Sequence, residues 1–256
     1  MASRQAKAQR RTAALVLALA TLIGPSSTGA QPPARPRVIG VFGDSLGDGL
    51  WAGLSQALRG GGAFQVVRFS RPATGLARYD YVNVEERARR QLAGRRIDIA
   101  VVMLGANDEQ GMFAGRQVLA FDTPPWRAIY AARIDALASL LRRNAGAVYW
   151  VGLPKMRRPA YDEKAQRLNA LYEMRARALG LPFVSTISAT VDAQGRYSDR
   201  LIDGDGRSRL MRGPDGVHMT MAGYRRLAAP VADKIRADMV RAGPAPAGAG
   251  RPPGAP

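Results

Sequence analysis

Cysteine is absent from this chain of 256 residues, and histidine occurs once, at His218. The lack of cysteine excludes disulfide bonds, thiolate metal ligands and a thiol nucleophile. If a reaction step needs an imidazole as its general base, His218 must therefore supply it. The alternative for a lone histidine is a hydrogen-bonded structural role. This alternative becomes less favoured than catalysis only when companion motifs occur elsewhere in the chain.

Acidic residues are also scarce, since 20 of them face 38 lysines and arginines, for a formal net charge of +18. Residues 1–30 carry four basic residues and no acidic one, so their removal leaves +14. Such a charge favours anionic partners, which outside the cell are glycans, lipid headgroups or wall polymers. The alternative is that the arginines lie scattered over solvated helix faces, because no compact basic run occurs inside the domain. We expect no nucleic-acid partner, and association with anionic envelope polymers stays open.

The apolar run 12–23 is too short to span a bilayer comfortably. It follows four basic residues and precedes the small residues 25–30, which is the pattern of a secretory signal peptide cleaved after Ala30. The stretch 242–256 is almost entirely Ala, Gly and Pro and cannot bury enough surface to fold. We expect a signal peptide over 1–30, a short linker over 31–36, one domain over 37–241 and a disordered tail over 242–256. The protein is then periplasmic or secreted.

Strand-like apolar runs alternate with helical patterns along this domain. The expected strands are 38–42, 64–69, 97–104, 148–153 and 182–185, and the expected helices are 50–58, 83–92, 126–143, 161–179 and 221–240. This alternation predicts βαβ crossovers and an α/β fold, with a central parallel sheet of about five strands covered on both faces. Ligands of such open sheets bind beyond the carboxyl ends of the strands.

Residues suited to acyl transfer follow three of these strands. Ser45 follows the first strand, Gly75 the second and Asn107 the third, so all three should meet at one edge of the sheet. Serine attack on an ester creates an oxyanion, for which the backbone N–H groups of Ser45 and Gly75 and the amide of Asn107 are suitable donors. The alternatives are a turn with positive φ at Gly75 and a turn or helix start at Asn107. Asp215, three residues before His218, completes a Ser-His-Asp set.

Four motifs, in this order, resemble those of the SGNH, or GDSL, hydrolase superfamily. They are Gly43-Asp44-Ser45-Leu46, Gly75, Gly105-Ala106-Asn107-Asp108 and Asp215-Gly216-Val217-His218. The resemblance implies Ser45 as nucleophile, His218 as base and then acid, and Asp215 as the residue that orients His218. It also implies an oxyanion hole formed by Ser45, Gly75 and Asn107, within a flavodoxin-like three-layer α/β/α sandwich.

Further stretches, such as Trp150-Val151-Gly152-Leu153-Pro154, look similar to a subgroup of bacterial periplasmic SGNH proteins without a well-defined substrate. The nucleophile motif departs from the common Gly-Asp-Ser-Leu-Ser form, because Gly47-Asp48-Gly49 follows Leu46. This departure bears on the shape of the adjoining pocket and leaves the implied role of Ser45 unchanged.

A long loop over 109–125 should lie beside the predicted site. Met112, Phe113 and Phe121 are its candidate lid or acyl-pocket residues. Trp126, at the end of the loop, either stacks on a sugar ring or packs against the sheet.

A second irregular stretch, 186–214, contains Asp203-Gly204-Asp205-Gly206. This run begins like a calcium loop, but Pro214 stands where a bidentate Glu would be required. We expect a turn or hairpin there, no metal site and no cofactor.

We interpret the chain as an exported serine esterase or acyltransferase that acts on small acyl esters, above all O-acetyl, of a cell-envelope or extracellular glycan. A lipid-directed or general carboxylesterase is the alternative among enzymes, and a wide apolar pocket formed by Met112, Phe113 and Phe121 would support it. A catalytically silent binder of anionic envelope polymer is the alternative of another class, against which the complete set of motif residues argues. Hydrolases and transferases form the same acyl-enzyme, so the sequence does not separate them.

Overall fold

A computed structural model describes residues 35–242 of the chain. At its centre lies a parallel sheet of five strands in the order β2-β1-β3-β6-β7. The strands are β1 (Arg37–Gly43), β2 (Phe64–Arg68), β3 (Ile99–Met103), β6 (Ala147–Val151) and β7 (Phe183–Val184). Each of them falls within or beside an expected strand, which confirms the predicted sheet. The expected signal peptide and the tail beyond residue 242 lie outside the described residues.

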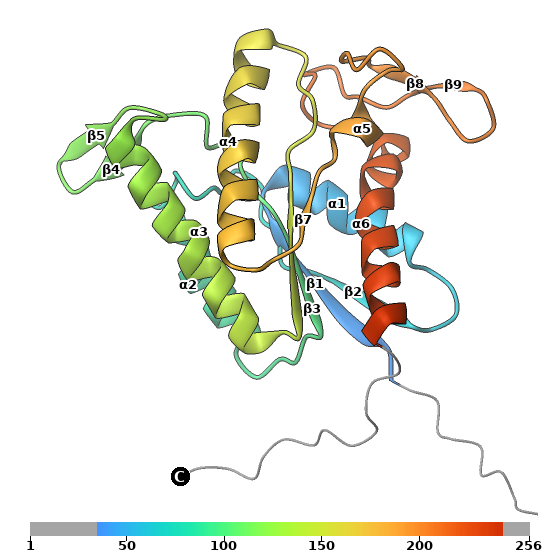
Figure 1. Ribbon diagram of the computed structural model, residues 1–256, viewed down its shortest axis with the longest axis horizontal. Coiled ribbons are helices and arrows are strands. Elements are labelled where there is room, and N and C mark those ends of the chain that lie inside the picture. Colours follow the sequence, from blue (N-terminus) through green and yellow to red (C-terminus); the bar gives the residue numbers. More distant parts are fainter. Residues whose placement is uncertain (1–34, 243–256) are drawn as a thin grey trace, which may run out of the picture. The chain divides into compact units, whose positions relative to one another are not determined.

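Helices cover both faces of the sheet (Figure 1). One face carries α1 (Ser45–Ala57) and α6 (Met221–Ala242), and the other carries α2 (Val84–Leu92), α3 (Pro124–Asn144) and α4 (Pro159–Ala178). Strand β3 is buried along its whole length, as a central strand covered on both sides must be. The architecture is the predicted α/β/α sandwich. None of the helices in the described range is both long and apolar enough to cross a membrane.

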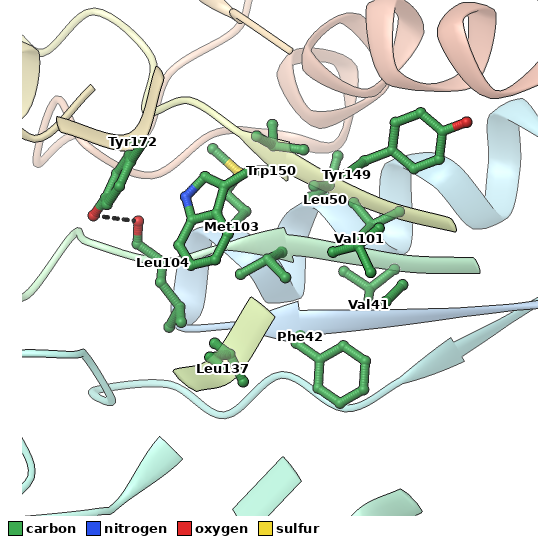
Figure 2. Close-up of a cluster of buried hydrophobic side chains, with 14 of the residues drawn as sticks. Val41, Phe42, Leu50, Val101, Met103, Leu104, Leu137, Tyr149, Trp150 and Tyr172 are labelled. Atoms are coloured by element: carbon green, nitrogen blue, oxygen red, sulfur yellow. Dashed lines mark hydrogen bonds between the residues drawn. The ribbon is translucent and has the colours of Figure 1, made fainter. Parts of the chain in front are cut away.

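Successive residues of β6 show how the two core layers arise. The hydroxyl of Tyr149 donates to Asp238 of α6 at 2.9 Å, whereas the ring of Trp150 lies 5.6 Å from that of Tyr172 in α4. Alternate side chains of a strand point to opposite faces, so one apolar run supplies both layers. Figure 2 shows this cluster of buried side chains, with Leu50 of α1 on one side of the sheet and Leu137 of α3 on the other.

Helix α1 begins at Ser45 rather than at the expected Leu50. The carboxylate of Asp44 caps it by accepting the backbone N–H groups of Leu46 at 2.9 Å and Gly47 at 3.4 Å. A Cβ at Gly53 would collide with the backbone carbonyl of Tyr224 in α6. Glycine at this position therefore allows α1 and α6 to approach closely.

Two short hairpins extend from the sandwich. The stretch 109–125, expected to be an irregular loop, contains the antiparallel pair β4 (Met112–Ala114) and β5 (Gln117–Leu119). The stretch 186–214 contains the short helix α5 (Ile187–Thr190) and the hairpin of β8 (Arg200–Ile202) and β9 (Ser208–Leu210). The second hairpin agrees with the expected one, and the first corrects the loop prediction.

Candidate active site

Ser45 occupies the first position of α1, directly after β1. The carboxylate of Asp44, which is fully buried, holds this turn in place. Its Oδ2 accepts the backbone N–H groups of Gly105 at 2.9 Å and Ala106 at 2.8 Å, and its Oδ1 caps α1. Burial raises the pKa of Asp44, although the four N–H donors act against this effect. One side chain thus ties the loop after β1 to the loop after β3, as the convergence of the motifs predicts.

A chain of hydrogen bonds links Asp215, His218 and Ser45. His218 Nε2 lies 2.7 Å from Ser45 Oγ, and His218 Nδ1 lies 2.5 Å from Asp215 Oδ2. Burial acts to raise the pKa of Asp215, but the bonds from the His218 side chain and from two backbone N–H groups lower it to about 2. The ionised carboxylate favours a proton on Nδ1, which leaves Nε2 free to accept the Ser45 proton.

Arg212 supports the segment that carries this histidine. Its guanidinium is almost wholly buried and donates to the carbonyl of Val217 at 3.2 Å and to that of Lys155 at 2.6 Å. Burial lowers the pKa of Arg212 to about 10, so the group is still charged at neutral pH. Sequence reasoning missed this residue, since no local pattern distinguishes one buried arginine from the many exposed ones.

Two of the predicted oxyanion donors, Gly75 and Asn107, lie on loops that contact one another. Asn107 Nδ2 donates to the carbonyl of Thr74 at 2.9 Å, which fixes the amide and leaves its second hydrogen available. Gly75 does not have the positive φ of the alternative reading, and a Cβ at this position would collide with Asp108 Oδ1. Glycine is therefore required here because the carboxylate of Asp108 approaches the backbone closely.

Asp108 is a second buried carboxylate that the sequence reasoning left without a role. It accepts the backbone N–H groups of Leu76 and Ala77, both at 2.9 Å, and the hydroxyl of Tyr130 at 2.7 Å. The Tyr130 hydroxyl in turn lies 2.7 Å from that of Tyr172. Burial raises the pKa of Asp108 to about 6. The network joins the loop of Gly75 to the loop of Asn107, and its only sequence signal is the Asp that ends the third motif.

The four candidate substrate contacts separate into buried and accessible residues. Met112 and Trp126 are buried in the core, and Trp126 stacks on Tyr130 with ring centroids 4.4 Å apart. The sugar-stacking reading of Trp126 and the pocket-lining reading of Met112 are corrected, because neither side chain reaches the surface. Phe121 is half-buried against the edge of Trp126 at 5.0 Å, and Phe113 is 59% exposed on β4.

Within residues 35–242, no group of three or more histidine or acidic side chains is arranged to hold a metal ion. Asp203 instead accepts the backbone N–H groups of Asp205 at 3.0 Å and Arg207 at 2.9 Å, as expected for a turn between two strands.

Residues 38–234 match the protein family DUF459, which is described as a family of unknown function. The chain belongs to this family. Among curated proteins, none matches the sequence.

Solved structures of esterases share the fold of this DUF459 protein. An aryl esterase from M. smegmatis is 18% identical over 79% of this chain and 99% of its own, with a TM-score of 0.55. A carbohydrate acetylesterase from Sinorhizobium meliloti is 20% identical over 79% of this chain and 100% of its own, with a TM-score of 0.55. A GDSL-like lipase from Bacteroides thetaiotaomicron VPI-5482 is 20% identical over 80% of this chain and 93% of its own, with a TM-score of 0.54. The likeness confirms the predicted SGNH fold.

Proposed function

We propose that this protein is a serine ester hydrolase in which Ser45 is the nucleophile, His218 the general base and Asp215 the residue that orients the imidazole. The observation that carries the proposal is the unbroken hydrogen-bond chain from Asp215 through His218 to Ser45 Oγ. The side chains of His218 and Asp215 are 45% and 48% exposed. A pair this exposed contributes little to stability, so its alignment on a serine is better explained by chemistry than by folding.

The first half of the reaction forms an acyl-enzyme. Ser45 Oγ attacks the ester carbonyl carbon while its proton passes to His218 Nε2. The carbonyl oxygen becomes an oxyanion, which the backbone N–H groups of Ser45 and Gly75 and the free hydrogen of the Asn107 amide stabilise. When the carbon–oxygen bond of the leaving alcohol breaks, His218 Nε2 returns the proton to that oxygen. The acyl group is then bonded to Ser45.

The second half removes the acyl group by the same proton transfers. His218 Nε2 takes a proton from an incoming hydroxyl, whose oxygen attacks the acyl carbon. The bond between that carbon and Ser45 Oγ then breaks, and Nε2 returns the proton to Oγ. Water as acceptor gives hydrolysis, and a sugar hydroxyl gives acyl transfer. We propose hydrolysis as the basic activity, with transfer as its variant.

For the substrate, we propose small acyl groups, above all acetyl, on a cell-envelope or extracellular glycan. The preference for small acyl groups rests on two of the three residues that were expected to form a wide apolar pocket. Met112 is buried, and Phe121 is packed against Trp126. The basic leader pattern of residues 1–30 supports an exported, periplasmic or secreted enzyme. A silent binder has no use for an aligned nucleophile and base.

A lipid-directed esterase is the second candidate, because the β4–β5 hairpin exposes an apolar pair. Phe113 and Val118 lie opposite one another across the hairpin and are 59% and 64% exposed. Such a tip could contact an acyl chain or a lipid surface.

The decisive experiment combines covalent labelling with an ester series. A serine-directed fluorophosphonate should label the purified protein once, and Ser45→Ala should lose both labelling and turnover while it keeps its melting temperature. Among p-nitrophenyl esters from acetate to laurate, kcat/KM should be highest at acetate, with acetate also released from acetylated polysaccharide. Labelling that persists in Ser45→Ala contradicts the nucleophile, and a maximum at laurate without acetate from any glycan selects the lipid-directed candidate.

A further inference from the structure

A cavity of about 780 Å³ lies between the segment that follows β6, the first turns of α4 and the loop 195–197. Its walls include the side chains of Lys155, Arg157, Arg167 and Arg196, together with Tyr197. Its volume falls within the range of sites that bind small molecules. Ser45 and His218 are not among its lining residues, so it is a separate site from the one described above.

The cavity adjoins the loop of the catalytic Asp215 and His218. The backbone N–H of Arg157 donates to the carbonyl of Gly216 at 3.2 Å, and Arg157 Nη2 donates to the carbonyl of Pro214 at 2.5 Å. Arg157 therefore lines the cavity and holds the residues on both sides of Asp215, Gly216 through its backbone and Pro214 through its side chain. A ligand in the cavity would lie beside the reacting centre rather than on a remote surface.

Three of the four cationic side chains around the cavity are already paired with carboxylates. The pairs are Lys155–Asp162 at 2.6 Å, Arg167–Glu163 at 2.6 Å and Arg196–Asp192 at 3.2 Å. Arg157 forms no ion pair with any residue from 35 to 242, and it is exposed. Its bond to Pro214 uses one donor, which leaves most of the guanidinium N–H groups available to an incoming anion.

The wall also offers an apolar surface. The ring of Tyr197 has the guanidinium of Arg212 stacked over it, 5.2 Å from the ring centroid, and Met156, Pro159 and Ala170 line the same cavity. An aromatic ring beside aliphatic groups can pack against the C–H face of a sugar, while the arginine binds a charged substituent.

We propose that this cavity binds an acidic sugar unit of the polymer that carries the ester, and that Arg157 binds the carboxylate of that sugar. The inference rests on the proposed function and names its substrate class: an acylated polysaccharide with carboxylated units. The planar guanidinium matches a carboxylate through two parallel charge-assisted hydrogen bonds, for which a neutral sugar has no ionised acceptor. Binding of the neighbouring sugar here would hold the esterified unit at Ser45.

Direct binding tests the subsite without any turnover. A short galacturonate oligosaccharide is titrated calorimetrically into the full-length Ser45→Ala protein, with a galactose oligosaccharide of the same length as the neutral comparison. Arg157→Gln should weaken galacturonate binding about tenfold or more, as expected for the loss of a charged hydrogen bond. The matched control Arg143→Gln removes the same charge at the C-terminal end of α3, away from this cavity, and should leave the affinity unchanged. Ala170→Trp, which fills the cavity without altering a charge, should weaken binding as well.

Equal affinity for the acidic and neutral oligosaccharides overturns the inference, as does an Arg157→Gln protein that binds like Arg143→Gln. Tighter binding of a glycerol phosphate oligomer than of galacturonate also overturns it and assigns the cavity to a phosphate-bearing polymer. The ester series on the unsubstituted protein reports separately on the proposed function. If esters are not cleaved and galacturonate still binds through Arg157, the catalytic proposal has failed and the binding site stands.

Discussion

Asp215, whose carboxylate is exposed, is the residue whose proposed role the hydrogen bonds define most clearly. It accepts hydrogen bonds from His218 Nδ1 and from two backbone N–H groups, and its pKa of about 2 keeps it ionised at neutral pH.

Asp215→Asn should therefore lower kcat on an acetyl ester by about 100-fold to 10,000-fold, because the amide no longer favours the proton on Nδ1. Steady-state kinetics measures the loss, and thermal melting serves as the control for folding. A variant with unchanged kcat contradicts the assigned role of Asp215.

A second prediction concerns Asp108 and the pH dependence of stability. Asp108 is fully buried, and burial raises its pKa to about 6. A carboxyl whose pKa is higher in the folded than in the unfolded state binds more protons when folded. Its contribution to stability is therefore greatest at low pH and decreases as the pH rises through that window. Between about pH 4 and pH 7, ionisation of this group should lower the free energy of unfolding by about 2 kcal/mol.

The variant Asp108→Asn cannot ionise, so its free energy of unfolding should change less over that range than that of the unsubstituted protein. Urea unfolding at several pH values measures the difference between the two. Parallel pH profiles would show that Asp108 does not titrate differently on folding.

Among the elements, α1 and α6 pack so closely that their contact requires glycine. Gly53 of α1 faces the backbone of Tyr224 in α6, where a Cβ has no room. Alanine is the better helix former by about 1 kcal/mol, but a collision with backbone cannot be relieved by a side-chain rotation.

Gly53→Ala should thus destabilise the protein by about 1–3 kcal/mol, as measured by denaturant unfolding. The control is Gln56→Ala in the same helix, whose side chain is partly exposed and which should change stability by less than about 0.5 kcal/mol. A Gly53→Ala protein of undiminished stability would show that the two helices are packed less closely.

At the scale of the whole molecule, the excess of arginine should affect the binding of neutral and anionic substrates differently. A neutral chromogenic ester needs no long-range attraction, whereas an anionic polysaccharide gains from a basic protein. Salt shortens the range of such attraction to about 3 Å at 1 M.

Raising the ionic strength from about 0.05 M to 0.5 M should therefore lower kcat/KM for an acetylated uronate polymer several-fold and leave that for p-nitrophenyl acetate nearly unchanged. Parallel steady-state assays measure both. An equal response of the two substrates would favour the alternative that the arginines are scattered over solvated helix faces and bind no substrate.

Local pattern was sufficient to predict the strands and helices of the sandwich. The apolar stretches of β1, β3 and β6 are short and continuous, which is typical of strands covered on both faces, and helical periodicity separates them. The β4–β5 hairpin was missed because its three-residue strands are shorter than any reliable alternation. The start of α1 was missed because Gly47 and Gly49, which are poor helix formers, lie in its first turns.

By itself, the sequence determined the residue types available for chemistry: one imidazole, no thiol, and a serine, a glycine and an asparagine that each follow a strand. In a parallel sheet such residues meet at one edge, so chain order was enough to predict their convergence. Only the tertiary structure decided which side chains are accessible, because burial depends on partners far away in the chain. Trp126 is enclosed by the core, while Arg157 reaches a cavity beside the loop of Asp215 and His218. The buried Asp44 and Asp108 connect loops that no local pattern links.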